Sequence, residues 1–275
     1  MRASVLAYWA AKEGSSPAEY EDAWQVLPAT GDEMPGDWVG VAVADGATES
    51  LLARQWARMM ANEFAAPSDA VCDANLFTEK VLALAAQWPA IVGSYIAKRE
   101  NAARPIQWYE RPGIEKGAFA TILTLQVNFD SQQAGSIQSQ IDPGITRVIG
   151  GWNSAALGDT CLFHVRNGSL KAAFPLSESA SFGTSPALLG TSGADPEAIM
   201  NHLRFAQGTV AEGDDLFVCT DALAAWFLAR AEGGHRPWET LRDLTEIGFT
   251  EWIAEARRNN SLRNDDVTLV HMDIW

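Results

Sequence analysis

Short strand-like runs make up much of this chain, and they follow one another in groups instead of alternating singly with helices. The runs are rich in β-branched or aromatic residues and are bounded by turn residues, as strands are. They comprise residues 4–10, 22–27, 38–44, 118–129, 148–157, 160–166, 169–174, 215–220 and 267–273. Neighbouring strands joined by short turns pair in antiparallel fashion. We therefore expect an α+β protein with antiparallel sheets.

The predicted helices fall into an early group and a late group. The first covers residues 49–65, where apolar side chains recur three to four positions apart and form one stripe. A second helix is predicted over residues 76–99, broken or kinked at Trp88-Pro89 because proline cannot donate a backbone hydrogen bond. Later helices are predicted over residues 196–203, 222–232 and 238–258.

The length of 275 residues suits one large domain, which we expect to span residues 1–275. Residues 130–146 are rich in Ser, Gln and Gly, which predicts a long exposed loop between two strands that pair in one sheet. Residues 174–209 contain several Pro and Gly residues around one short helix. We expect this segment to form an irregular surface subdomain.

Charge and cysteine content exclude several classes of partner. With 20 basic and 35 acidic residues the formal charge is -15, which repels a nucleic-acid backbone. Cys72, Cys161 and Cys219 lack the spacing of a metal site or redox pair, so a reducing cytoplasm is expected. The first residues suit a strand better than a secretory signal, and no apolar stretch approaches the ~20 residues that cross a bilayer. We expect neither a nucleic-acid nor a membrane partner.

Acidic residues stand at the ends of several predicted strands. Asp45 follows residues 38–44 and Asp221 follows residues 215–220. Glu21 and Asp22 precede residues 23–27, and Asp265 and Asp266 precede the last strand. In an antiparallel pair the end of one strand lies beside the start of its neighbour. These carboxylates are therefore expected to meet at one edge of the fold.

Each of these acids alone is most simply a turn former or a helix cap. Together, without nearby basic residues, they would repel one another and require a cation. Oxygen ligands favour Mg²⁺ or Mn²⁺, whereas zinc prefers His or Cys. The histidines are scattered and are expected to serve packing or the surface; they are His164, His202, His235 and His271. Asp159, in the Gly158-Asp159 turn, joins the site only if that turn opens on the same edge.

Six segments, taken in order, resemble the motifs of the metal-dependent protein phosphatases called protein phosphatase 2C. They are Tyr20-Glu21-Asp22-Ala23, Val43-Ala44-Asp45-Gly46, Gly117-Ala118-Phe119-Ala120-Thr121, Leu157-Gly158-Asp159-Thr160, Thr220-Asp221-Ala222-Leu223 and Asn264-Asp265-Asp266-Val267-Thr268. The match covers almost the whole chain. Asp45-Gly46-Ala47-Thr48-Glu49-Ser50 also resembles a bacterial branch of that family, which carries Asp-Gly-Ala-Ser/Thr-Glu.

The resemblance implies an α-β-β-α sandwich of two antiparallel sheets flanked by helices, with metals at one end of the sheets. It implies that Asp45 bridges two Mg²⁺ or Mn²⁺ ions, that Glu21 and the Gly46 carbonyl complete one ion, and that Asp221 and Asp265 complete the other. Asp159 with Asp221 is a candidate for a third ion. Asp45, Asp221 and Asp265 would then act through metal-activated water, while Asp22 and Asp266 would orient metal waters or hold the strand starts.

The implied function is hydrolysis of phosphoserine and phosphothreonine in a phosphorylated protein, which makes the chain a phosphoric monoester hydrolase in signalling. In that family residues 174–209 correspond to a variable flap beside the site. Two features depart from the pattern. The family's phosphate-binding Arg is missing upstream of Glu21, which leaves Lys12, Arg54 and Arg263 as candidates, and Ala47 stands where some members carry a His.

Two other interpretations stay open. A binding module on the same fold would hold metal and recognise a phosphorylated partner or ligand with weak or no turnover; the missing phosphate-binding Arg favours it, whereas the full set of acids favours the enzyme. An unrelated acidic metal-binding domain is the third, and six ordered motifs argue against it. The oligomeric state, the substrate, the kinase and the metal used in the cell are left open.

Overall fold

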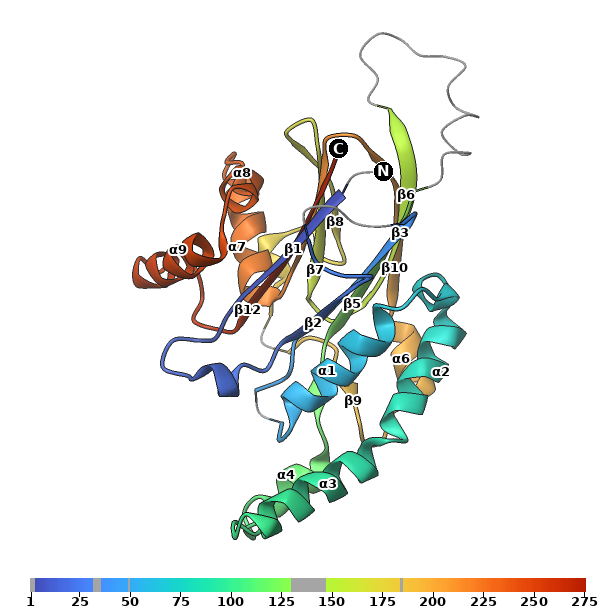
Figure 1. Cartoon of the computed structure of the whole chain (residues 1–275), viewed down its shortest axis with the longest axis vertical. Helices are drawn as coiled ribbons and strands as arrows, with labels where there is room; N and C mark the ends of the chain where they lie inside the picture. Colours follow the sequence, from blue (N-terminus) through green and yellow to red (C-terminus); the bar gives the residue numbers. More distant parts are fainter. Residues whose placement is uncertain (1–2, 32–35, 49, 130–146, 184) are drawn as a thin grey trace.

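The computed structural model describes residues 3–31, 36–48, 50–129, 147–183 and 185–275. Two five-stranded antiparallel sheets face each other (Figure 1). The first runs in the order β1 (Ala3–Ala10), β12 (Val267–Ile274), β11 (Asp214–Cys219), β7 (Cys161–Arg166) and β8 (Ser169–Phe174). The second runs β10 (Arg204–Ala211), β6 (Val148–Leu157), β5 (Ile122–Asn128), β3 (Trp38–Ala44) and β2 (Ala23–Leu27). The α+β sandwich predicted from the sequence is confirmed.

Helices cover the outer face of each sheet. α1 (Ala53–Phe64) packs on β3 and β2, and α2 (Ala74–Ala85) and α6 (Pro196–His202) lie beside it (Figure 1). On the other sheet α7 (Asp221–Glu232) packs against β11 and β12, and α9 (Glu246–Arg258) packs against β1. α8 (Pro237–Arg242) contacts α7. α3 (Trp88–Asn101) and α4 (Arg111–Lys116) form an arm that extends from the body (Figure 1).

Strand β3 shows how the sequence divides the core into layers. Its alternate residues Val39, Val41 and Val43 are buried between the two sheets. Ala42 and Ala44 point the other way and are buried beneath α1. Because successive side chains of a strand point to opposite faces, branched residues fill the sandwich while small residues let the helix approach closely. Both faces of β3 are therefore apolar. Packing against the other sheet on one face and against α1 on the other fixes the position of the strand and of its end.

Several element boundaries differ from those predicted. The early helix begins at Ala53, while Glu49 lies outside the described residues. The predicted break at Trp88-Pro89 is confirmed, because α2 ends at Ala85 and α3 starts at Trp88. The single helix predicted over 238–258 is wrong: α8 ends at Arg242, and Thr245 caps α9 by accepting a hydrogen bond from the Gly248 N–H.

The strand predicted over 118–129 is divided at Thr121. The first piece, β4 (Phe119–Ala120), leaves the sheet and pairs with β9 (Leu189–Gly190), while β5 continues in the sheet. The predicted loop 130–146 lies outside the described residues, but its flanking strands β5 and β6 are antiparallel neighbours, as expected. Within the segment 174–209, the last residues belong to β10 at the edge of the second sheet; sequence reasoning missed this strand and also α4.

By length and composition, the helical stretch Ala74–Asn101 qualifies as a candidate membrane span, contrary to the expectation that no stretch would. In the structure it is two helices, and Phe77, Val81 and Leu84 of α2 are buried in the core cluster beneath α1. Apolar side chains of a core helix meet the same test of length and composition. In the structure 17% of the 18-residue window that meets the test is buried, so the packing of α2 accounts for only part of its apolar character.

Candidate metal centre

Asp45 lies directly after β3, where the chain leaves the sheet and turns toward α1. The turn is fixed to β4 by hydrogen bonds: the Thr121 N–H donates to the Asp45 carbonyl (2.8 Å) and the Ala47 N–H donates to the Phe119 carbonyl (2.9 Å). Ser50 Oγ also accepts from the Phe119 N–H (3.2 Å). Because β4 leaves the sheet, its backbone can form these hydrogen bonds, and they hold the Asp45-Gly46 turn in place.

Gly46 brings two backbone segments of the site together. A Cβ atom at this position would lie 2.6 Å from the carbonyl oxygen of Glu21 and 3.1 Å from the Cβ of Ala53. Only glycine leaves room for this approach, because real Cβ atoms do not come so close to backbone oxygen. The close packing places the backbone of Glu21 beside the end of β3.

Four of the predicted carboxylates line one pocket of about 520 Å³. They come from four different elements: Asp45 after β3, Asp159 in the β6–β7 turn, Asp221 at the start of α7 and Asp265 before β12. The remaining lining residues are Gly46, Ala47, Thr48, Ser50, Lys116, Phe119, Thr121, Ser185, Pro186 and Leu188. The structure thus brings together residues separated by long stretches of sequence.

These carboxylates are electrostatically strained by burial and by one another. Burial, followed by repulsion from Asp22 and Asp221, raises the pKa of Asp45 well above its ordinary value. Burial and the charge of Asp221 raise the pKa of Asp159 to about 6. The pKa of Asp221 is also raised, chiefly by burial. Such mutual repulsion is relieved by a cation placed among the oxygens.

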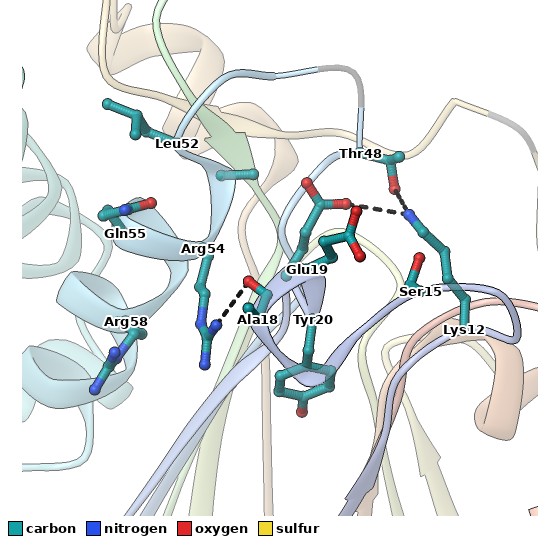
Figure 2. A pocket seen from close by; sticks show the side chains of 12 residues that line it. Lys12, Ser15, Ala18, Glu19, Tyr20, Thr48, Leu52, Arg54, Gln55 and Arg58 are labelled. Atoms are coloured by element: carbon teal, nitrogen blue, oxygen red, sulfur yellow. Dashed lines mark hydrogen bonds and ion pairs between the residues drawn. The ribbon is translucent and has the colours of Figure 1, made fainter. Parts of the chain in front are cut away.

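Glu21 lies just outside this pocket and lines a neighbouring one. Lys12 Nζ is 3.4 Å from its carboxylate, and burial raises the pKa of Glu21. Thr48 lines both pockets, so the two are adjacent. Figure 2 shows Thr48 beside Lys12 in the neighbouring pocket. The structure therefore places Glu21 at the border of the four-carboxylate pocket.

Asp22 and Asp266 are both buried and do not line the pocket. Asp22 Oδ2 accepts a hydrogen bond from Thr268 Oγ1 (2.7 Å), which ties β2 to β12. Asp266 accepts from the backbone N–H groups of Lys12 (2.8 Å) and Glu21 (2.7 Å). Both residues hold the strand starts in register, one of the two roles expected for them.

The three predicted phosphate-binding cations are engaged with protein atoms. Lys12 contacts Glu21, and Arg263 contacts the Asp221 carboxylate and lies 4.0 Å from that of Asp265. Arg54 Nη1 donates to the carbonyl of Ala18 (2.9 Å). Three of the predicted ligand acids, Glu21, Asp221 and Asp265, thus have a basic partner. Sequence reasoning expected no such partners, because the pairs join segments that only the tertiary fold brings together.

Lys116 is the cation that sequence reasoning missed. It lines the four-carboxylate pocket, and its Nζ lies 5.7 Å from the centre of the Phe119 ring. The available signal was its position directly before the Gly117-Ala118 motif, at the end of a helix that was not predicted. A cation at the pocket wall can contact an anionic ligand bound in front of the carboxylates.

The donor set suits hard divalent cations. Among the residues that the structure describes, no three carboxylate, imidazole or thiol groups close on a common point as a finished metal site. The side chains that do converge offer oxygen donors, which Mg²⁺ and Mn²⁺ prefer. One of them, Asp159 Oδ1, is buried with no hydrogen-bond partner within the described ranges. An orphaned, buried carboxylate oxygen is costly unless a cation satisfies it.

Comparisons with known proteins bear on the fold. No protein-family model and no curated protein matches the sequence. Among solved structures, a bacterial serine phosphatase is similar with a TM-score of 0.56 at 9% identity, over 98% of this chain and 97% of that one. The Mycobacterium tuberculosis serine/threonine phosphatase PstP/Ppp follows with a TM-score of 0.54 at 14% identity, over 100% of this chain and 99% of that one.

The photosystem II phosphatase PBCP is similar to the same degree, with a TM-score of 0.54 at 12% identity over 99% of both chains. These likenesses span the full length of the chain and include both sheets and their helical layers. At such low identity they establish the architecture. The chain has the protein phosphatase 2C-like fold of the serine/threonine phosphatases.

Proposed function

We propose that this protein is a divalent-metal-dependent phosphatase that hydrolyses phosphoserine and phosphothreonine in proteins. The observation that carries the proposal is the meeting of Asp45, Asp159, Asp221 and Asp265 around one pocket. The pocket belongs to a fold shared with serine/threonine phosphatases. Glu21, the remaining carboxylate that we expect to bind metal, lies at the border of the same pocket.

In this proposal Asp45, Asp221, Asp265, Glu21 and the Gly46 carbonyl hold two Mg²⁺ or Mn²⁺ ions. Asp159 is the candidate ligand for a third, since its Oδ1 is buried and lacks a partner among the described residues. Bound divalent ions of this kind lower the pKa of water and neutralise charge on phosphoryl oxygens. Free cysteine plays no part, since Cys161 and Cys219 are buried and Cys72 lies in none of the pockets described here.

The protein's own contribution is to position charge. Asp266 and Asp22 fix the starts of β2 and β12, which keeps Glu21 and Asp265 near the pocket before any ligand arrives. Lys116 on the pocket wall and Arg263 beside Asp221 supply positive charge for the phosphoryl oxygens. Preorganised charges of this kind act more strongly in a partly buried pocket than in water.

The test is hydrolysis of p-nitrophenyl phosphate and of a phosphothreonine peptide with added Mn²⁺ or Mg²⁺. Wild type is compared with Asp45→Ala and Asp221→Ala, and with Asp243→Ala as a matched control, because Asp243 is exposed and outside the pocket. We expect metal-dependent turnover in wild type and in the control, and turnover close to background in both pocket variants. Turnover that survives in Asp45→Ala would refute the proposal.

One observation favours a second function. Arg263 contacts the Asp221 carboxylate. Among the described residues that line the pocket, none is a histidine that could protonate a leaving group. A binding module that takes up metal and a phosphorylated partner is compatible with this arrangement. Tight Mn²⁺ binding by calorimetry, together with absent turnover of both substrates, would identify it. A reducing cytoplasm stays the predicted location for either function.

A further inference from the structure

A second pocket of about 520 Å³ lies beside the four-carboxylate pocket, between α1 and residues 12–21 (Figure 2). We call it the arginine pocket, after Arg54 and Arg58. Lys12, Ala18, Glu19, Glu21 and Thr48 also line it. Thr48 belongs to both pockets, so a ligand in one pocket borders the other.

The two arginines stand four residues apart on α1 and therefore share one face of the helix. The opposite face is anchored in the core by Trp56, Met60 and Phe64, which prevents the helix from turning. Arg54 is tied to the wall by its hydrogen bond to the Ala18 carbonyl (2.9 Å). Arg58 is exposed, and it forms no hydrogen bond or ion pair with any residue the structure describes.

The acids in the arginine pocket are already engaged. Glu19 accepts hydrogen bonds from the backbone N–H and the hydroxyl of Ser16, both at 2.8 Å. Glu21 is contacted by Lys12. Neither carboxylate reaches an arginine through an ion pair in the described part of the chain, so the guanidinium donors of Arg58 are left for a ligand. In a protein with a charge of -15, a pocket with free cationic donors is a distinct feature.

We propose that the arginine pocket binds an anionic side chain that flanks the phosphorylated residue of the substrate. This rests on the proposed function, since the phosphorylated residue itself would enter the four-carboxylate pocket. An extended peptide advances about 3.3 Å per residue, so a side chain two or three positions away reaches about 7–10 Å along the surface. Guanidinium groups pair with carboxylate and phosphate alike, so the anion is an acidic residue or a second phosphate.

The experiment measures substrate preference in wild type, Arg58→Gln and the control Arg230→Gln, whose arginine is exposed on α7. The reference peptide has phosphothreonine with alanine at every flanking position. In two further series, one flanking alanine at a time is replaced by glutamate or by phosphoserine, on either side of the phosphothreonine. The preference is the ratio of kcat/KM for an anionic peptide to that for the alanine peptide. Affinities are measured in parallel by fluorescence anisotropy, with the phosphothreonine replaced by a non-hydrolysable phosphonate.

We expect wild type and Arg230→Gln to prefer an anion at one flanking position by about two- to fivefold, as an exposed ion pair gives. Arg58→Gln should lose that preference in both measurements. A larger gain from phosphoserine than from glutamate would identify a second phosphate, and equal gains an acidic residue. A wild type without positional preference, or a preference that persists in Arg58→Gln, would overturn the inference.

The anisotropy measurement separates this inference from the proposed function. Should wild type fail to hydrolyse p-nitrophenyl phosphate with Mn²⁺, the phosphatase proposal fails. The arginine pocket is then judged by peptide affinity alone. Affinity that depends on the flanking anion and on Arg58 still supports it, and affinity that depends on neither refutes it.

Discussion

Asp266 accepts a hydrogen bond of 2.7 Å from the backbone N–H of Glu21, although 245 residues separate them in the chain. Its other oxygen accepts from the Lys12 N–H (2.8 Å). One buried carboxylate thus joins the beginning of the loop after β1, the residues just before β2 and the start of β12. The position of Glu21 beside the four-carboxylate pocket depends on this connection.

Replacing Asp266 with asparagine should destabilise the protein and weaken the metal centre. Asparagine has only one acceptor oxygen, so its NH₂ group would face one of the two backbone donors. A buried donor left unsatisfied costs about 1–3 kcal/mol. Urea unfolding should show a loss of that size, and calorimetry should show weaker Mn²⁺ binding. Asp243→Asn, at an exposed position outside the pocket, is the control; equal stability of Asp266→Asn and wild type would contradict the argument.

Neutralising Asp45 should stabilise the metal-free protein while removing its response to metal. Burial and the neighbouring acids raise the pKa of Asp45, so its charged form costs free energy in the fold. In EDTA at pH 7, Asp45→Asn should therefore raise the free energy of unfolding, because the amide has no charged form to bury. Added Mn²⁺ should raise the melting temperature of wild type only.

The same raised pKa values give the pH dependence a definite sign. A group whose pKa is higher in the folded state binds more protons when folded, so metal-free stability increases as the pH falls. For Asp159 the window lies between about pH 7 and pH 4, because its pKa of about 6 exceeds the ordinary value. Wild type in EDTA should therefore unfold at a higher urea concentration at pH 5 than at pH 7. A lower urea midpoint at pH 5 than at pH 7 would contradict the raised pKa values of the buried carboxylates.

Asp214, far from the pocket, should give the opposite dependence in acid. It is fully buried and accepts hydrogen bonds from His164 (2.9 Å) and Arg166. Although burial raises its pKa, the bonds from Arg166 and His164 lower it below the ordinary value. Its stabilisation is present above about pH 4 and is lost as the pH falls through the lowered pKa.

Asp214→Asn should cost about 3 kcal/mol at pH 7, because breaking a buried pair leaves Arg166 without its partner. The variant should also lose less stability than wild type between pH 5 and pH 3. Urea unfolding across this range measures both effects. The exposed residue Glu251 supplies the control, Glu251→Gln, which should follow wild type. An unchanged acid slope in Asp214→Asn would show that other groups control the acid transition.

The sandwich was predictable because its strands have strong local patterns. The valines and alanines of β3 alternate with the two faces that they fill, and Asp45 marks the point where the strand ends. β10 lacks such a pattern: half of its residues are exposed, and Gly208 lies beneath the indole of Trp152, where a Cβ would come within 2.6 Å. Pairing with β6 makes it a strand, which its own sequence does not indicate.

The sequence predicted which acids line the candidate site. It did not predict which basic residues would pair with them. Strand ends show that Asp45, Asp221 and Asp265 lie at element boundaries, and antiparallel pairing brings such boundaries together. The contacts of Lys12 with Glu21 and of Arg263 with Asp221 depend on how loops cross between elements. Local patterns carry no information on that crossing.

Arg263 offers the most direct test of how charge is balanced at the centre. Its guanidinium contacts the Asp221 carboxylate and lies 4.0 Å from that of Asp265, so it competes with a metal ion for the same oxygens. Arg263→Gln should tighten Mn²⁺ binding by up to about fivefold, the strength of one exposed ion pair. If the freed guanidinium binds phosphoryl oxygens once metal is bound, the same variant should raise the KM for p-nitrophenyl phosphate.

Calorimetry in the absence of phosphate gives the first quantity, and kinetics at saturating Mn²⁺ gives the second. The control is Arg258→Gln, an exposed arginine near the end of α9. Weaker Mn²⁺ binding in Arg263→Gln would mean that the arginine positions Asp221 as a ligand, because losing a competitor can only strengthen binding. Tighter metal binding with an unchanged KM would exclude Arg263 as the phosphate contact and make Lys116, which lines the pocket, the next residue to replace.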